Sequence, residues 1–205
     1  MALVEEGGLA TTVSKAVAIA ARIGFPVVIK VQAAAFSNKS DIGGVILNLR
    51  DAAALRDGWA RLMANLNGAA IDGVLVEQMS APGLELVVGA RHHPEWGASV
   101  MVGLGGVLIE ALDAAELLPA DISHARAVER IRSLRGAKLL GDFLGRPARD
   151  VEAVADVVVR VGAAMRAGLN IEEIDINPLM VMAAGEGAIA LDALIVTGAR
   201  SEEHT

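Results

Sequence analysis

Two lysines and two glycines near the N-terminus have the types and spacing to bind a polyphosphate. Lys30 ends a short apolar run, and Lys39 and Ser40 follow in a polar stretch that leads to Gly43 and Gly44. Ammonium groups and the backbone N–H groups of a glycine-bearing loop can converge on phosphate oxygens. A lysine that follows an apolar strand is costly to bury, which favours a functional role for Lys30.

A second set of polar side chains, near the C-terminus, has the pattern of a site for a hard cation. Glu173, Asp175 and Asn177 alternate with isoleucines, so in a strand their side chains project from one face. Such oxygen donors suit Mg²⁺, which takes few protein ligands and completes its shell with phosphate and water. The alternative is a solvated strand face with ordinary carboxylates. Asp192, isolated in a later apolar run, favours the cation site because a lone aspartate there needs a partner.

The apolar periodicity predicts the helices and strands that would position these residues. Helices are expected over 12–23, 51–66, 123–134 and 149–167. Strands are expected over 26–31, 44–49, 73–79, 84–90, 99–102, 107–111, 171–181 and 188–196. This mixture predicts an α/β (α+β) protein. Residues 1–76 would form a smaller N-terminal lobe, truncated at its start, and residues 77–205 a larger C-terminal lobe, with a turn sequence at 80–83 between them.

Composition argues against several classes of function. The formal net charge is −7, the basic residues are scattered and aromatic residues are 2% of the chain, so nucleic-acid binding is not expected. The absence of cysteine removes disulfides, thiolate metal sites and a cysteine nucleophile. The N-terminus lacks a signal-peptide pattern, and acidic residues interrupt the long apolar stretches. We therefore expect a cytoplasmic protein without membrane spans.

Seven short motifs occur in one order along nearly the whole chain: FPVVIKV, NKSDIGGV, GVLVEQM, LELVVGAR, GLGG, EIDINPL and LDA, at residues 25–31, 38–45, 73–79, 84–91, 103–106, 173–179 and 191–193. In this order they resemble the ATP-grasp domain of the nucleoside-diphosphate-forming acyl-CoA synthetases. That group includes the ADP-forming acetate–CoA ligases and is related to the succinyl-CoA synthetase β subunit. The resemblance implies an ATP-grasp fold, with ATP and Mg²⁺ lying between two lobes.

The resemblance also implies a role for each matching position. Lys30 would bind the α and β phosphates, and a loop closing over the triphosphate would carry Lys39, a catalytic residue, together with Ser40, Gly43 and Gly44. Glu77, Gln78 and Met79 would form the hinge edge that contacts adenine. Glu85 would face the ribose or the metal. Arg91 would neutralise charge on the transferred phosphoryl group. The metal ligands would be Asn177 and Asp192, with Asp175 and Glu173 as lesser candidates.

Three departures from the family pattern bear on turnover. Asn38 stands where many members have a histidine that can carry a phosphoryl group, and an amide cannot do so. Residues 116–118 offer no arginine before Pro119, where the family usually has one. His93 stands where an acidic residue is common.

The resemblance implies the reaction acid + CoA + ATP ⇌ acyl-CoA + ADP + phosphate, with this chain supplying the nucleotide half. A CoA-binding, Rossmann-like subunit or domain would supply the other half and admit the acid and CoA, and an oligomer is possible. The mean hydropathy of +0.49 fits a surface covered by such a partner, or simply the many alanines. Two alternatives remain: a degenerate nucleotide-binding or regulatory module, and another ATP-grasp ligase with an acyl-phosphate intermediate.

Overall fold

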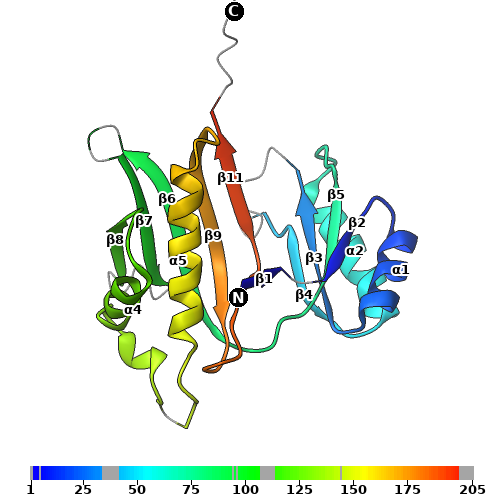
Figure 1. The fold of residues 1–205 in the computed structure, drawn as a ribbon. Helices are drawn as coiled ribbons and strands as arrows, with labels where there is room; N and C mark the ends of the chain where they lie inside the picture. The colour runs from blue at the N-terminus through cyan, green and yellow to red at the C-terminus, as the bar shows by residue number, and fades with distance from the viewer. Residues whose placement is uncertain are drawn as a thin grey trace, which may run out of the picture. The chain divides into compact units, whose positions relative to one another are not determined.

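The chain folds into two compact units, which are described separately. The computed structural model describes residues 2–4, 6–33, 42–93, 95, 97–106, 114–143 and 145–198. The N-terminal unit is Glu5–Ser80, and the C-terminal unit is Ala81–Thr205 together with Met1–Val4 (Figure 1). The division after Ser80 coincides with the predicted turn, whereas residue 76 lies within a strand.

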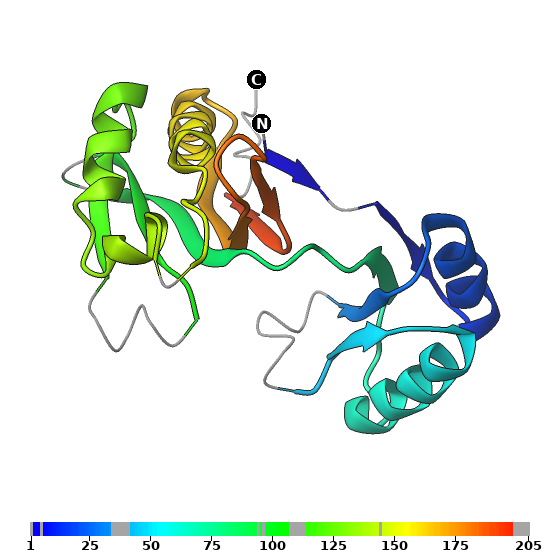
Figure 2. The ribbon, with the colours of Figure 1, turned by 90° about the horizontal axis from the view of Figure 1, so that it is seen from below.

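The N-terminal unit is an antiparallel sheet with two helices on one face (Figure 2). Its strands are β2 (Gly7–Ala10), β3 (Val27–Gln32), β4 (Val45–Leu49) and β5 (Gly73–Gln78), in the order β2-β5-β3-β4. The helices are α1 (Val13–Ile23) and α2 (Ala52–Leu66). Each begins at an N-cap side chain: Thr12 accepts from the Lys15 N–H at 3.3 Å, and Asp51 accepts from the Ala54 N–H at 2.8 Å.

Alternation along β3 separates a core face from an open face in this unit. Val27, Ile29 and Val31 are fully buried in the cluster that includes α1 and α2 residues. Lys30 lies between Ile29 and Val31, so its side chain leaves the strand on the face away from the helices. The strand thus delivers the predicted phosphate-binding lysine to the face without helices.

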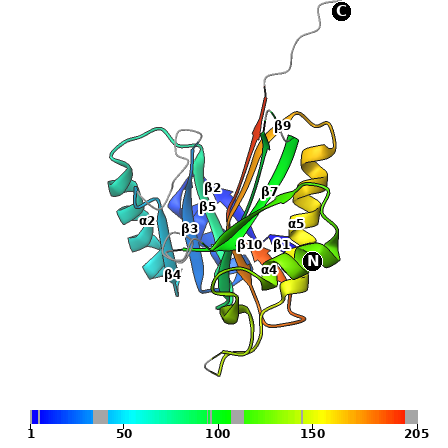
Figure 3. The same cartoon turned by 90° about the vertical axis from the view of Figure 1, so that its left-hand side faces the viewer.

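The C-terminal unit is a larger sheet covered on one face by helices (Figure 3). The strands run in the order β1-β10-β9-β6-β7-β8, with β11 also paired to β9. Their bounds are β1 (Ala2–Val4), β6 (Leu84–His93), β7 (Gly97–Leu104), β8 (Ala115–Pro119), β9 (Ile171–Val181), β10 (Ala188–Ala190) and β11 (Ala193–Thr197). The covering helices are α4 (His124–Arg132), the short 3₁₀ helix η1 (Ala137–Leu140) and α5 (Val151–Arg166).

The core of this unit joins α5 to the helix-side face of the sheet. Val88, Val102 and Leu179 from three strands are fully buried with Val154 and Val158 of α5. Gly162 allows close approach, because a Cβ there would lie 2.2 Å from the carbonyl oxygen of Ala120. The opposite face of the sheet is left open by the described helices.

A buried aspartate anchors the start of α5. Asp150 Oδ1 accepts from the Ala153 N–H at 3.0 Å as the N-cap, and Oδ2 accepts from the N–H groups of Gly185 and Gly187 at 3.0 and 2.9 Å. These hydrogen bonds offset the cost of burying the carboxylate. Asp150 thereby fixes the turn between β9 and β10 against the helix.

The mixed α/β class and the predicted helices are confirmed, with helix ends within a few residues of those expected. The expected strand over 188–196 is wrong in one respect, because it breaks at Leu191 and Asp192 into β10 and β11. Strands β1, β2 and β8 were not predicted, and the strand expected over 107–111 lies outside the described residues. Within the described part of the chain, no helix is long and apolar enough to cross a membrane.

Candidate functional site

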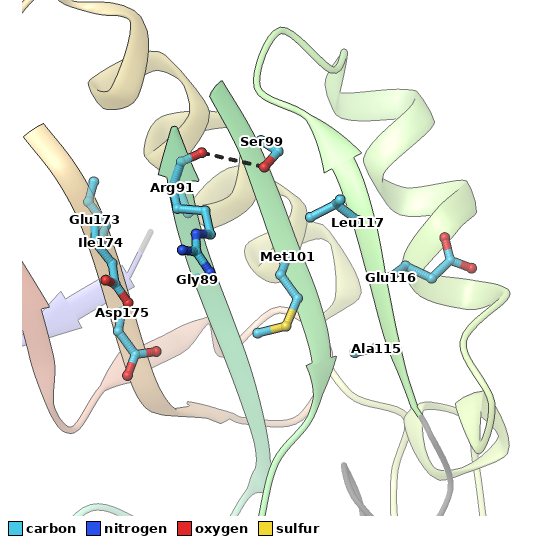
Figure 4. Close-up of a pocket in the computed structure, with 11 residues that line it drawn as sticks. Gly89, Arg91, Ser99, Met101, Ala115, Glu116, Leu117, Glu173, Ile174 and Asp175 are labelled. Atoms are coloured by element: carbon cyan, nitrogen blue, oxygen red, sulfur yellow. Dashed lines mark hydrogen bonds between the residues drawn. The ribbon is translucent and has the colours of Figure 1, made fainter. Parts of the chain in front are cut away.

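The open face of the C-terminal sheet carries a groove that contains three of the predicted site residues. It has a volume of about 430 Å³ and lies across β6, β7, β8 and β9 (Figure 4). Arg91, Glu173 and Asp175 form its polar part, whereas Met101 and Leu117 form part of its apolar wall. Figure 4 shows the Arg91 side chain extending over Gly89, between the carboxylates of β9 and Met101. The groove lies entirely within the C-terminal unit.

Strand register explains why these residues meet. Arg91 pairs with Ser99 of β7 on one side and with Glu173 of β9 on the other. Two residues back along β6, Gly89 pairs with Met101 and Asp175. Since residues two apart on a strand share a face, all of these positions line the open face. Gly89 has no side chain, which leaves room for Arg91 above it.

The electrostatics of the groove favour an added cation beside the carboxylates. Burial raises the pKa of Asp175, and the negative charges of Glu173 and then Asp192 raise it further. A bound cation would relieve this repulsion. Arg91 forms no ion pair with any acidic residue that the structure describes, so its guanidinium is available to an anion.

Asn177 follows Glu173 and Asp175 along β9, and Asp192 lies next to it. The Asn177 N–H donates to the backbone oxygen of Asp192 at 3.2 Å, and Asp192 Oδ1 accepts from the Ala193 N–H at 3.0 Å. Among the described residues, no three His, Cys, Asp or Glu side chains are arranged to hold a metal. The Asn177 amide and the Asp192 carboxylate, with one carboxylate from Asp175 or Glu173, nevertheless fit Mg²⁺. This ion takes most of its ligands from water and phosphate.

In the N-terminal unit, Lys30 is part of a buried ion pair. Its Nζ lies 2.6 Å from Glu77 Oε2, and the two side chains are 11% and 9% exposed. Gln78 ends β5 and Met79 follows it, and their N–H groups donate at 3.0 Å to the carbonyl oxygens of Glu6 and Pro26, respectively. Sequence analysis found both charged residues but did not predict that they pair.

The predicted phosphate loop is described only in part. Lys39, Ser40 and Asn38 lie outside the described residues. Gly44 accepts from the Val31 N–H at 2.8 Å through its carbonyl oxygen. Gly43 has a φ of +64°, and its carbonyl oxygen accepts from the Asn65 side chain at 2.9 Å. These contacts fix the end of the loop against β3 and α2.

Glu85 is exposed at the start of β6, beside the glycine motif. Its carbonyl oxygen accepts from the Gly105 N–H at 2.7 Å. A Cβ at Gly105 would lie 3.0 Å from the Glu85 Cβ, so this glycine is required for the close approach. The motif therefore has a packing role beside Glu85.

Glu116 occupies β8 in the segment where the family arginine was not found. It points away from the groove (Figure 4), and its Oε2 lies 2.7 Å from Arg130 Nη2 of α4. The neighbouring Leu117 is 71% exposed and lines the groove instead. Sequence analysis missed Ser99, Met101 and Leu117, because only strand pairing with Arg91 places them in the groove.

Comparisons with known proteins place these features in one family. Residues 3–197 match the family model described as an ATP-grasp domain. The chain is 44% identical over 188 residues to trans-feruloyl-CoA synthase FCS1 of an unknown prokaryotic organism, covering 89% of this chain and 27% of that protein. It is 34% identical over 197 residues to the β subunit of ADP-forming acetate–CoA ligase I of Pyrococcus furiosus, covering 94% of this chain and 84% of that subunit.

A solved structure has the same fold. The dinucleotide-forming acetyl-coenzyme A synthetase 1 of Candidatus Korarchaeum cryptofilum, solved with coenzyme A, Ca-AMPCP and HgCl⁺, superposes with a TM-score of 0.89 at 34% identity. The match covers 95% of this chain and 86% of that one. The chain thus spans most of a separate β subunit but only about a quarter of the length of the longer relatives.

Proposed function

Because the chain belongs to the ATP-grasp domain family, we propose that it is the ATP-binding module of an ADP-forming acyl-CoA synthetase. The complete reaction is acid + CoA + ATP ⇌ acyl-CoA + ADP + phosphate. The observation that carries the proposal is the open groove in which Arg91, without an ion-pair partner among the described residues, lies beside the carboxylates of Glu173 and Asp175. An arginine and a cation site side by side are what phosphoryl transfer requires, since its catalysis is mostly positioning and charge neutralisation.

In this proposal, Arg91 binds phosphate, and the neighbouring carboxylates and amide bind the metal. Arg91 binds the transferred phosphoryl group, because a guanidinium can donate two parallel hydrogen bonds to its oxygens. Asn177 and Asp192 would hold Mg²⁺, with Asp175 or Glu173 as a further ligand, and the bound cation would supply charge neutralisation on the phosphates. Binding of the cation would also offset the burial and the repulsion by Glu173 and Asp192 that raise the pKa of Asp175.

The remaining predicted residues bind the rest of the nucleotide. Lys30 contacts the α and β phosphates, and the backbone edge at Glu77, Gln78 and Met79 contacts adenine. Glu85 faces the ribose or the metal. The loop residues Lys39 and Ser40, which lie outside the described part of the chain, close over the triphosphate with Gly43 and Gly44.

A CoA-binding subunit or domain completes the reaction in this proposal. Support comes from the relatives, one of which is a β subunit and another of which is several times longer than this chain. The acid and CoA enter through that partner, in the cytoplasm. Two observations favour the alternative of a degenerate nucleotide-binding module: Asn38 at the position of a phosphoryl-carrying histidine, and Glu116 paired with Arg130 in the segment without the family arginine.

Calorimetric titration with ATP, in the presence and absence of Mg²⁺, tests the proposal. We expect Mg²⁺-dependent binding by the wild type and about tenfold weaker binding by Arg91→Met, the loss of one charge-assisted contact. Arg126→Met is the matched control, since Arg126 is exposed and pairs only with Glu129 within α4. Equal affinity in both variants would exclude Arg91 from the phosphate site.

A turnover assay separates the ligase from the degenerate module. The chain is mixed with acetate, CoA, Mg-ATP and a CoA-binding subunit of an ADP-forming acetate–CoA ligase, and ADP is measured. Acid- and CoA-dependent ADP formation supports the ligase. Tight ATP binding without ADP formation supports the degenerate module.

A further inference from the structure

Lys30 and Glu77 form a largely buried ion pair in the described part of the N-terminal unit. Lys30 Nζ and Glu77 Oε2 are 2.6 Å apart, and each side chain is about one-tenth exposed. β3 and β5 are adjacent strands, in which Glu77 pairs with Val28, two residues from Lys30. The two side chains therefore leave neighbouring strands on the same face.

The neighbouring strand β2 makes room for the glutamate. Gly7 pairs with Glu77, and a Cβ at Gly7 would lie 2.8 Å from Glu77 Cγ and 2.6 Å from the Val76 carbonyl oxygen. The absence of a side chain at Gly7 allows the Glu77 side chain to lie across the sheet. The carboxylate of Glu77 contacts Lys30 of β3, while its backbone pairs with both β2 and β3.

We propose that Glu77 is a positioning residue, which holds the Lys30 ammonium in place for the nucleotide phosphates. A lysine side chain is flexible, and an adjacent carboxylate at this depth restricts where its ammonium group can lie. The carboxylate at 2.6 Å holds the ammonium group at the open face. This inference rests on the proposed function, and in it the Glu77 side chain acts on the nucleotide only through Lys30.

A double-mutant cycle on ATP affinity tests this role. We expect Lys30→Met and Glu77→Ala each to weaken ATP binding about tenfold, and the double variant to bind within about twofold of Lys30→Met. Glu77→Gln should be intermediate, because its amide oxygen can still accept from Lys30 without supplying charge. Glu6→Ala is the control: it removes an exposed carboxylate next to β2 and should leave affinity unchanged.

Two results would overturn the proposal. One is a loss of ATP affinity of about a hundredfold in the double variant, which is the product of the two single losses. That result would mean that Glu77 acts independently of Lys30. The other is that Glu77→Gln loses as much affinity for adenosine, measured by competition, as it loses for ATP. That result would indicate a contact between Glu77 and the base. If Glu77→Ala does not fold, the same cycle is run with Glu77→Gln, which keeps the side-chain shape. Failure of the wild type to bind ATP would refute the proposed function instead.

Discussion

Replacing Lys30 should cost folding stability as well as ATP affinity, and the structure allows the stability loss to be sized. Lys30→Met removes the cationic partner of Glu77, whose carboxylate is 9% exposed and has no other cationic partner among the described residues. Breaking a buried pair by removing one partner costs about 3–5 kcal/mol, because the remaining charge stays desolvated. The remaining solvent access favours the lower end, about 3 kcal/mol.

The matched variant is Lys30→Met combined with Glu77→Gln, which removes both charges of the pair. Removing both charges avoids the desolvated carboxylate, so at least about 2 kcal/mol of the loss should return. Urea denaturation of the full chain, followed by circular dichroism, measures both differences. A Lys30→Met variant within about 0.5 kcal/mol of the wild type would refute the reasoning, since a buried unpaired carboxylate cannot be that inexpensive. The double variant also allows ATP binding to be measured in a stable protein.

Three further predictions follow from single contacts. Because the pKa of Asp175 is raised, the native state holds its proton to higher pH than the unfolded chain does, so the contribution of Asp175 to stability should fall as the pH rises above the ordinary value of 3.8. Asp175→Asn should flatten this fall slightly in urea titrations while weakening Mg²⁺-dependent ATP binding. Asp150→Ala should lower the unfolding free energy by about 2–3 kcal/mol, because it removes a helix cap and two buried hydrogen bonds to the β9–β10 turn. Gly162→Ala should lower it by about 1–3 kcal/mol in the same assay, since its Cβ would clash with Ala120.

Most helices and the longer strands could be predicted from the sequence because local chemistry determines their ends. Thr12, Asp51 and Ser123 cap helices through their own side chains, and those contacts involve residues only three positions away. Strand β8 was missed because Ala115–Pro119 has no clear alternation and is defined by its pairing with β7. The break at Asp192 likewise depends on contacts with Asn177 and Pro178 on another strand.

The same distinction between local contacts and cross-strand contacts decides which features of the site could be predicted. The alternation that placed Glu173 and Asp175 on one face is a local property, and the groove contains both. That Arg91 lies opposite Glu173, with Met101 and Leu117 beside them, depends on the register of β6, β7, β8 and β9. The Lys30–Glu77 pair is also a cross-strand contact, between residues far apart in sequence. The local sequence of each strand does not show which strand it pairs with, so it predicts neither arrangement.

The location of the bound nucleotide tests the central claim most directly. Amide chemical shifts of the full chain are recorded as Mg-ATP is added. The account predicts the largest C-terminal-unit changes at the groove residues Gly89, Arg91, Met101 and Asp175. Saturable ATP binding that leaves these amides unchanged, with shifts instead around the separate pocket lined by Arg146, Arg149 and Glu186, would contradict it.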